Sequence, residues 1–314
     1  MPRPGFVLEV DRSTPPLLFH HGEGFRLHKL PSGARAIYAP EPLDGLDDVD
    51  GAIRDALLHP LDADPLPALL HPGMTLTIAF DDVSLPLPQM RRPDIRQRVT
   101  EPVLDLAADA GVDDVELIAA LALHRRMTEA ELRRAVGDRV YDAFAPRGRL
   151  YNHDAEDPEA MAFLGTTDQG EEVEISRRAA ESDLLVYVNI NLVAMDGGHK
   201  SVATGLASYR SLRHHHNVDT MRQSRSFMDQ HRSELHSSNW RMGRLIAASG
   251  VKVFQIETNL NTDTFPAPFD FLQRREWEWS ARDRMTFIAA SKSVDRAPRR
   301  LARRSRQREG AAAR

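Results

Sequence analysis

Residues 182–217 read SDLLVYVNINLVAMDGGHKSVATGLASYRSLRHHHN and predict a strand, a glycine turn and a helix in succession. The apolar, β-branched run 184–190 is typical of a strand buried on both faces of a sheet. Gly197 and Gly198 then lead into Lys200. Proteins of the α/β class use this order to place a phosphate or a cofactor at the end of a sheet. The spacing matches neither GxxxxGK[ST] nor GxGxxG, so it predicts a ligand site without identifying the ligand.

Further core strands and helices alternate along the chain on both sides of this stretch. Strands are expected at 75–80, 115–121 and 251–257, with a shorter one at 172–175. Helices are expected at 52–58, 93–110, 128–137, from 157 to a stop at Gly165, and at 219–248. This alternation predicts an α/β fold with a doubly wound, largely parallel sheet flanked by helices.

The expected domain organisation has four parts. Residues 1–24 are expected to be irregular, and residues 25–262 to form the α/β domain, beginning with a hairpin over 25–40 that turns at 31–33. Residues 263–294 are expected to form a short helical extension in place of a full second domain. Residues 295–314 are expected to be an Arg-rich disordered tail.

Composition excludes several classes of function. The 314 residues contain 41 Lys and Arg against 46 Asp and Glu, and the net charge of −5 gives no nucleic-acid signature. There is no cysteine, which rules out disulfides, thiolate metal sites and a cysteine nucleophile. No apolar run is long enough for a membrane span, so we expect a cytoplasmic protein without a membrane partner.

Polar side chains follow the predicted strands where each strand ends, and they should share one crevice. They are Asp82, His124, Lys200 and one or two of His214–His216. A histidine there can act as a base or bind a metal ion, and a lysine can pair with phosphate or bond covalently to a cofactor carbonyl. The structural alternatives are an Asx turn at Asp82, a surface cation at Lys200 and a solvated helix end at the histidines.

These residues lie in segments that resemble a known family. The segments are FDDVSLPLP (80–88), ALALHRRMTEAEL (120–132), NHDAEDPEAMAFLGTTDQG (152–170), GGHKSVATGLASY (197–209) and HHN, ending at Asn217. Together with VFQIETNLN from Val253 and the N-terminal hairpin, they cover roughly residues 25–262. In combination they resemble the nickel-dependent lactate racemases and their relatives.

The resemblance implies a cofactor and roles for particular residues. The family carries a nickel-pincer nucleotide, nickel pyridinium-3,5-bisthiocarboxylic acid mononucleotide, whose sulfur groups hold nickel. Lys200, which follows the Gly197-Gly198 turn, would be joined to it through a thioamide, and Gly197 and Gly198 would belong to the cofactor site. The other implied roles are phosphate binding for Asp82 and Ser84, nickel ligation for His216, which follows Lys200 along the next helix, and acid/base catalysis for His124.

The implied activity is racemisation or epimerisation of a 2-hydroxy acid. Hydride leaves the substrate α-carbon for the cofactor and returns to either face of the ketoacid, while a base takes the hydroxyl proton. The implied partner is a small-molecule 2-hydroxy acid, with a second chain or a homo-oligomer as a possible source of the rest of the cleft.

The sequence departs from the family pattern at several positions. Leu85 replaces the motif arginine, and Thr204 replaces a proline. Asn191 or a neighbour takes the place of the second catalytic histidine, and His199 is the alternative candidate for that role. About fifty residues follow Thr262, too few for the family's second domain. The alternative function is therefore a non-catalytic relative that binds the nucleotide or cofactor without turnover. A third is a nucleotide-binding α/β domain without nickel.

Overall fold

The computed structural model describes residues 7–21, 24–38, 43–83, 90, 92–191, 196–260, 265 and 267–291. The chain forms two compact units. The larger comprises Leu46–Leu85 and Arg92–Leu260, and the smaller comprises Met1–Gly45, Pro86–Arg91 and Asn261–Arg314. The domain boundaries expected from the sequence, at residues 24, 262 and 294, stay a prediction.

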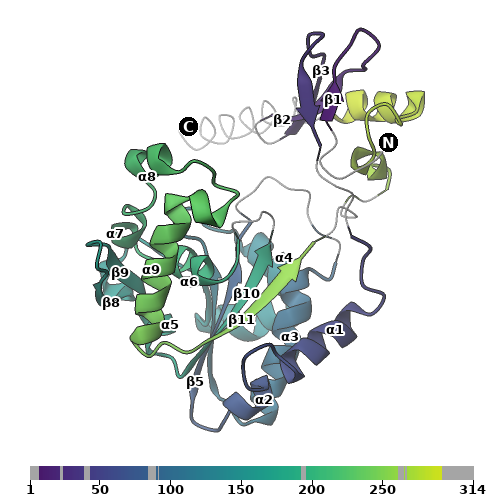
Figure 1. The fold of residues 1–314 in the computed structure, drawn as a ribbon. Helices are drawn as coiled ribbons and strands as arrows, with labels where there is room; N and C mark the ends of the chain where they lie inside the picture. Colours follow the sequence, from purple (N-terminus) through teal and green to yellow (C-terminus); the bar gives the residue numbers. More distant parts are fainter. Residues whose placement is uncertain are drawn as a thin grey trace, which may run out of the picture. The chain divides into compact units, whose positions relative to one another are not determined.

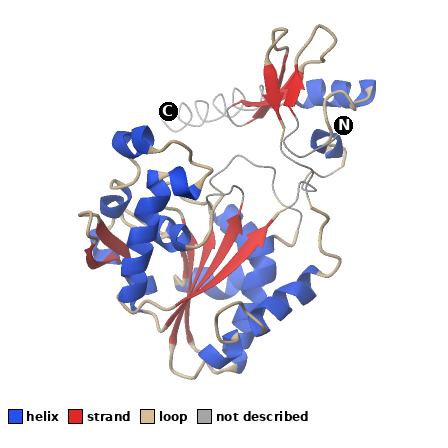
Figure 2. Cartoon of the chain, in the orientation of Figure 1, coloured by secondary structure: helices blue, strands red, loops and turns tan. Residues whose placement is uncertain are grey.

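A five-stranded sheet forms the centre of the larger unit (Figures 1 and 2). Every neighbouring pair in it is parallel. The strand order is β11 (Val253–Asn259), β10 (Leu184–Asn191), β5 (Thr75–Asp81), β6 (Asp114–Ala120) and β7 (Leu150–Asn152). The predicted α/β fold with a parallel, doubly wound sheet is confirmed.

Helices cover both faces of this sheet (Figure 1). On one face lie α1 (Val49–Leu58), α2 (Leu66–Leu69), α3 (Ile95–Asp109) and α4 (Glu129–Phe144). On the other lie α5 (Arg177–Glu181), α6 (His199–Gly205) and α9 (Glu234–Ala248). Strand β10 serves both cores, because Val186 and Val188 point into the first while Leu185 and Tyr187 point into the second. An apolar run without polar alternation is what such a strand requires.

Helix α4 begins as predicted and consists of two helical segments joined by a kink at Gly137. The Thr128 side chain caps it and Glu131 reaches back to the Thr128 backbone, so the capping box is confirmed. The first helical segment ends at Gly137 as expected, because Gly137 takes φ 83° and ψ 161°, which are not helical. A second helical segment, which the sequence did not predict, follows this kink and runs to Phe144. The buried Val136 and Val140 on either side keep both halves against the same core.

Two other expected helices differ in the structure. The Asp157 carboxylate does accept from Glu159 N, but only the short 3₁₀ turn η2 (Pro158–Ala160) follows. The chain then becomes β8 (Met161–Thr166), which pairs antiparallel with β9 (Glu172–Ser176), because 167–170 form a tight turn. The helix expected over 219–248 is divided into α8 (Val218–Gln223), η3 (Gln230–Arg232) and α9.

The smaller unit contains strands where an irregular segment was expected. Strand β1 (Val7–Glu9) pairs with β4 (Arg35–Ile37), and β2 (Leu17–His21) pairs with β3 (Gly24–His28). The hairpin expected over 25–40 is therefore wrong, since β3 and β4 pair with different strands.

The described C-terminal part of this unit is helical, with η4 (Asp270–Gln273) and a helix over 281–291. Phe271, Trp279 and Phe287 form its core. The tail at 295–314 lies outside the described residues. Across the described ranges, no helix combines the length and apolar character that crossing a membrane demands.

Candidate functional site

The carboxyl ends of four parallel strands bring the predicted side chains to one edge of the sheet. Asp81 ends β5 and Asp82 follows it, while Asn191 ends β10. His124 follows β6 after a turn, and Glu257 lies near the end of β11. In open α/β sheets this edge holds the ligand crevice.

His124 and Asp82 form a hydrogen-bonded pair. The distance from His124 Nδ1 to Asp82 Oδ2 is 3.1 Å. A carboxylate only accepts, so the hydrogen of the neutral ring lies on Nδ1 and leaves Nε2 with a lone pair. The Asp82 side chain is 7% exposed and the His124 ring 52%. The hydrogen bond to Asp82 raises the pKa of His124 above its ordinary value, although burial of the ring opposes this.

Asp81, which the sequence analysis did not single out, holds β5 and β10 together at this edge. Tyr187 Oη donates to one of its carboxylate oxygens (3.1 Å) and Ile190 N to the other (2.7 Å). Burial raises the pKa of Asp81 to about 6. Asp81 thus links β5 to β10 at the residue before Asp82. Arg96, itself paired with Asp94, donates to the carbonyls of residues 81 and 82 and fixes the exit of β5.

The glycine turn places Lys200 at the same edge. Gly197 and Gly198 have φ values of 88° and 57°, which favour glycine. A Cβ at Gly197 would lie 2.6 Å from Glu257 Oε2, so a side chain there would collide with that carboxylate. Gly198 N donates to Glu257 Oε1 (2.8 Å) and holds the turn against β11. Lys200 Nζ donates to Asp196 Oδ1 at 2.5 Å.

Asn191 belongs to a polar network under this turn. Asn189 Nδ2 donates to Asn191 Oδ1 and to Glu257 Oε2, each at 2.7 Å. Ser201 Oγ donates to Asn189 Oδ1, and Gln255 Nε2 donates to Ser201 Oγ. The amide of Asn191 can offer hydrogen bonds here, but it cannot take up or release a proton near neutral pH.

The three consecutive histidines point to different surroundings. They follow the short helix α7 (Tyr209–Leu212), so His216 lies in a turn after α7 and not on α6, the helix that contains Lys200. His214 contacts Glu172, and His215 is buried. Burial lowers the pKa of His216, and the charges of Lys200 and His124 lower it further. Lys200, His124 and His216 therefore lie close enough to interact electrostatically.

Other predicted residues fall elsewhere. Ser84 and Leu85 lie outside the described residues. His199 is exposed, and a Cβ at Gly243 would lie 2.4 Å from its ring, so His199 packs against α9. The sequence analysis did not predict that His236, which lies on α9, is near the site. Burial lowers its pKa, as does the charge of Lys200, and its Nδ1 is buried without a hydrogen-bond partner in the described part of the chain. No pattern in the sequence distinguishes this histidine from an ordinary helix residue.

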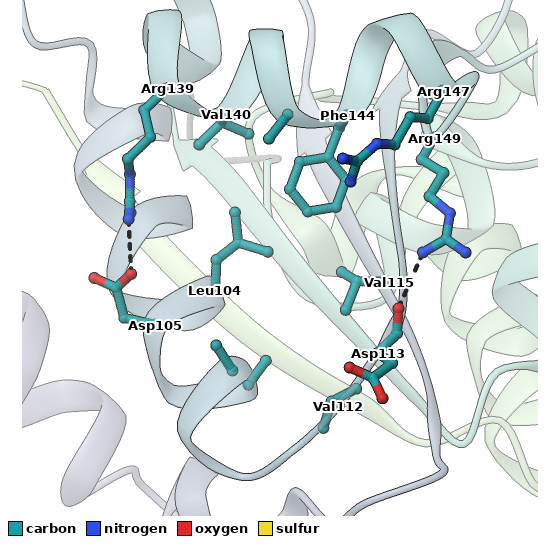
Figure 3. Close-up of a pocket in the computed structure, with 13 residues that line it drawn as sticks. Leu104, Asp105, Val112, Asp113, Val115, Arg139, Val140, Phe144, Arg147 and Arg149 are labelled. Atoms are coloured by element: carbon teal, nitrogen blue, oxygen red, sulfur yellow. Dashed lines mark hydrogen bonds and ion pairs between the residues drawn. The ribbon is translucent and has the colours of Figure 1, made fainter.

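A cavity at the opposite end of the sheet contains none of the predicted residues (Figure 3). It has a volume of about 300 Å³ and lies between α3 and α4, beside the amino end of β6. Its charged rim is partly occupied by internal contacts, since Arg139 pairs with Asp105 (2.9 Å) and Arg149 donates to the Asp113 carbonyl (3.0 Å). The sheet edge with His124 and Lys200 remains the candidate site.

Fold and site together define a doubly wound α/β protein whose lysine, histidines and carboxylates gather at the carboxyl end of a parallel sheet. Residues 21–229 match the sequence model of the family described as the lactate racemase N-terminal domain, and the chain belongs to this family. The predicted resemblance to lactate racemases is confirmed.

Two curated relatives carry the name lactate racemase. They come from Thermoanaerobacterium thermosaccharolyticum and Lactiplantibacillus plantarum, and each is 26% identical over 52% of this chain. The chain spans only 37% of the length of either relative.

Solved structures support the fold. The lactate racemase apoprotein of T. thermosaccharolyticum matches 79% of this chain and 57% of its own with a TM-score of 0.58 at 21% identity. A protein of Thermotoga maritima matches 70% of this chain and 53% of its own with a TM-score of 0.54 at 18% identity.

Proposed function

We propose that this protein is a racemase or epimerase of a 2-hydroxy acid that uses a nickel-pincer nucleotide. The observation that carries the proposal is the gathering of Lys200, His216 and the His124–Asp82 pair at one sheet edge. An amine that could tether a cofactor, an imidazole that could bind a metal ion and a positioned base are all required, and all are present.

The donor set fits such a cofactor. Among the described residues, no group of three or more His, Cys, Asp or Glu could hold a metal ion by itself. A metal held mainly by the sulfurs of its own cofactor needs few protein ligands, and His216 would supply one. Lys200 would carry the tether after leaving Asp196, and Asp82 and Ser84 would lie near the phosphate. When bound, the cofactor supplies the hydride acceptor.

His124 would be the base. With its hydrogen on Nδ1 facing Asp82, the Nε2 lone pair takes the substrate hydroxyl proton. Asp82 then stabilises the imidazolium that forms, and the proton is returned from Nε2 when the product hydroxyl re-forms. Asn191 would orient the substrate hydroxyl or carboxylate by hydrogen bonding.

The rival is a relative that binds the cofactor without turnover, and Asn191 favours it. A reaction in both directions requires a proton acceptor for each hand of the substrate, and an amide cannot be one. Loss of optical rotation from single enantiomers of a panel of 2-hydroxy acids separates the two proposals. Loaded protein that changes the rotation of a panel member while its α-deuterium is retained supports the racemase, because the hydride returns to the carbon that it left. Cofactor-loaded protein that leaves every rotation unchanged supports the rival.

The tether is tested by intact mass. Protein produced together with the cofactor-synthesis enzymes should carry a mass adduct on Lys200 and contain nickel. Lys200→Arg should abolish the adduct, because a guanidinium does not form the thioamide. Lys252→Arg is the matched control and should keep the adduct, since Lys252 is an exposed lysine preceding β11. Wild-type protein without adduct or nickel would refute the proposed function.

A further inference from the structure

A tight turn carries the chain from the end of β6 to His124. His124 N donates to the Leu121 carbonyl (2.8 Å), which closes a turn over residues 121–124. Ala122, the second residue of this turn, has a φ of 51°. Turns with a positive φ at this position favour glycine, asparagine or aspartate, because a Cβ is crowded in left-handed backbone. Alanine is therefore strained here, and strained residues persist only where their surroundings hold them.

The backbone N–H of Ala122 provides one of the contacts that hold it. Ala122 N donates to the carbonyl of Gly205 (3.0 Å), the last residue of α6, which also contains Lys200. A Cβ at Gly205 would lie 3.1 Å from the Cβ of Ala120, so the end of α6 lies directly against the end of β6. The turn before His124 is thereby joined to the helix of Lys200.

The methyl group of Ala122 provides a second contact. Ala122 packs against a small buried cluster of apolar side chains, Ala155, Ala207 and Leu212. Leu212 ends α7, and the chain continues from there into the turn that contains His216. Glycine at position 122 would adopt the left-handed backbone without strain, but it would lose this packing.

We propose that Ala122 is a positioning residue whose left-handed backbone and packed methyl group fix the turn that directs His124 towards Asp82. Its two contacts connect this turn to the segments that carry Lys200 and His216. The proposal rests on the proposed function only for the use of His124 as a base. The geometry of the turn exists without cofactor, so the mass experiment on Lys200 and the experiment below can fail separately.

The pKa of His124 in cofactor-free protein reports whether its ring still faces Asp82. NMR of protein labelled at histidine follows the ring between about pH 5 and 9, and the signal is identified by its loss in His124→Gln. Wild type should show a pKa above the ordinary value, because Asp82 stabilises the imidazolium. In Ala122→Gly the pKa should fall part of the way towards that of Asp82→Asn. A wild-type pKa in folded Ala122→Gly would overturn the proposal.

Asp62→Gly is the matched control. Asp62 has the same φ of 51°, but it is exposed and lies between α1 and α2, away from the candidate site. This variant should leave the pKa of His124 unchanged. Ala122→Ser keeps a Cβ and should also leave it unchanged. A lowered pKa in Asp62→Gly would show a general effect of added backbone freedom and would contradict the role of Ala122.

A change on the other side of the packing contact tests how Ala122 acts. Ala155→Gly removes another methyl group of the cluster, so it should lower the pKa of His124 in the same direction. The double variant should lower it no further than the larger single change, because both remove one shared contact. Additive shifts would contradict the proposed contact. Lys200 and Asp81 also influence the pKa of His124, but neither residue is changed in these variants.

Ala155→Gly also decides the case in which Ala122→Gly does not fold, as judged by circular dichroism. A lowered pKa of His124 in Ala155→Gly then supports the proposal. An unchanged pKa contradicts it, because the cluster would not be holding the turn.

Discussion

The His124–Asp82 pair shows how one hydrogen bond can set the pH range of a reaction. The carboxylate stabilises the imidazolium and so raises the pKa of His124. A raised pKa makes a stronger base, but it also means that more of the ring is protonated and inactive below that pKa. Activity should therefore fall on the acid side as His124 takes up its proton.

Asp82→Asn should move that acid limb to lower pH. Without the carboxylate the pKa of His124 falls, so the ring stays neutral to lower pH, while the maximal rate drops because the imidazolium is no longer stabilised. We expect the rate to fall less than in His124→Gln, which should lose about 10²- to 10⁴-fold. The measurement is kcat/KM against pH with loaded protein.

Asp105→Asn is the matched control for this experiment. Asp105 also pairs with a cation, Arg139, but at the other end of the sheet. It should leave the pH profile unchanged. A wild-type profile in Asp82→Asn would show that Asp82 does not act on His124 during turnover.

At the scale of elements, α4 joins two helical segments through a glycine that no other residue could replace without strain. Gly137 combines φ 83° with ψ 161°, and a Cβ there would lie 2.3 Å from the Gln97 side chain. Gly148 has a similar φ of 69° but open space around it. Alanine at Gly148 therefore measures the free-energy cost of the left-handed backbone alone. Alanine at Gly137 measures that cost together with the cost of a steric collision.

Gly148→Ala should lower the free energy of unfolding by about 1 kcal/mol, the cost of left-handed backbone for alanine. Gly137→Ala should lower it more, on the order of 2–3 kcal/mol, because the backbone region is glycine-specific and Gln97 must also move. Urea unfolding of the two variants measures both. Equal losses would mean that Gln97 adjusts without cost.

Elements whose signal is local could be predicted from the sequence. A continuous apolar run predicts strand β10. The capping box at the start of α4 depends only on Thr128 and on Glu131, three residues later. Strand β8 could not be predicted in this way. The sequence at Asp157 is typical of a helix start, but pairing with β9 makes the residues that follow the short 3₁₀ turn a strand. Strands β1 and β4 likewise pair across more than twenty residues.

The same distinction applies to the site. His124 and Lys200 follow strands of one parallel sheet, so their shared edge follows from topology. Glu257 follows the same rule and could have been found, since it lies near the end of a predicted strand. His236 could not, because it lies on α9, and only the packing of α9 against α6 brings it close enough to Lys200 for the charges to interact.

At the scale of the whole molecule, buried histidines couple folding to pH. Burial lowers the pKa of His153, His215, His216 and His236. An unfolded histidine takes up a proton near pH 6.5, whereas these rings resist it in the folded state. Each contributes stability that is fully present above about pH 6.5 and is lost as the pH falls below it. Asp81 and His124 oppose this trend, because their pKa values are raised.

His153 isolates this effect, because it is 4% exposed and lies outside the candidate site. Its Nε2 donates to the Ala207 carbonyl (3.0 Å), and glutamine can keep such a donor without titrating. Between pH 7.5 and 5.5, His153→Gln should therefore lose less stability than wild type. The difference in the free energy of unfolding should be at most roughly 1.4 kcal/mol per pH unit below 6.5, the limit for one proton.

Urea unfolding at the two pH values measures this difference. The opposing contributions of Asp81 and His124 cancel, because both proteins contain these residues. His71→Gln, at an exposed ring, should keep the wild-type pH dependence. A pH dependence in His153→Gln identical to wild type would show that His153 is protonated in the folded protein as readily as in the unfolded chain.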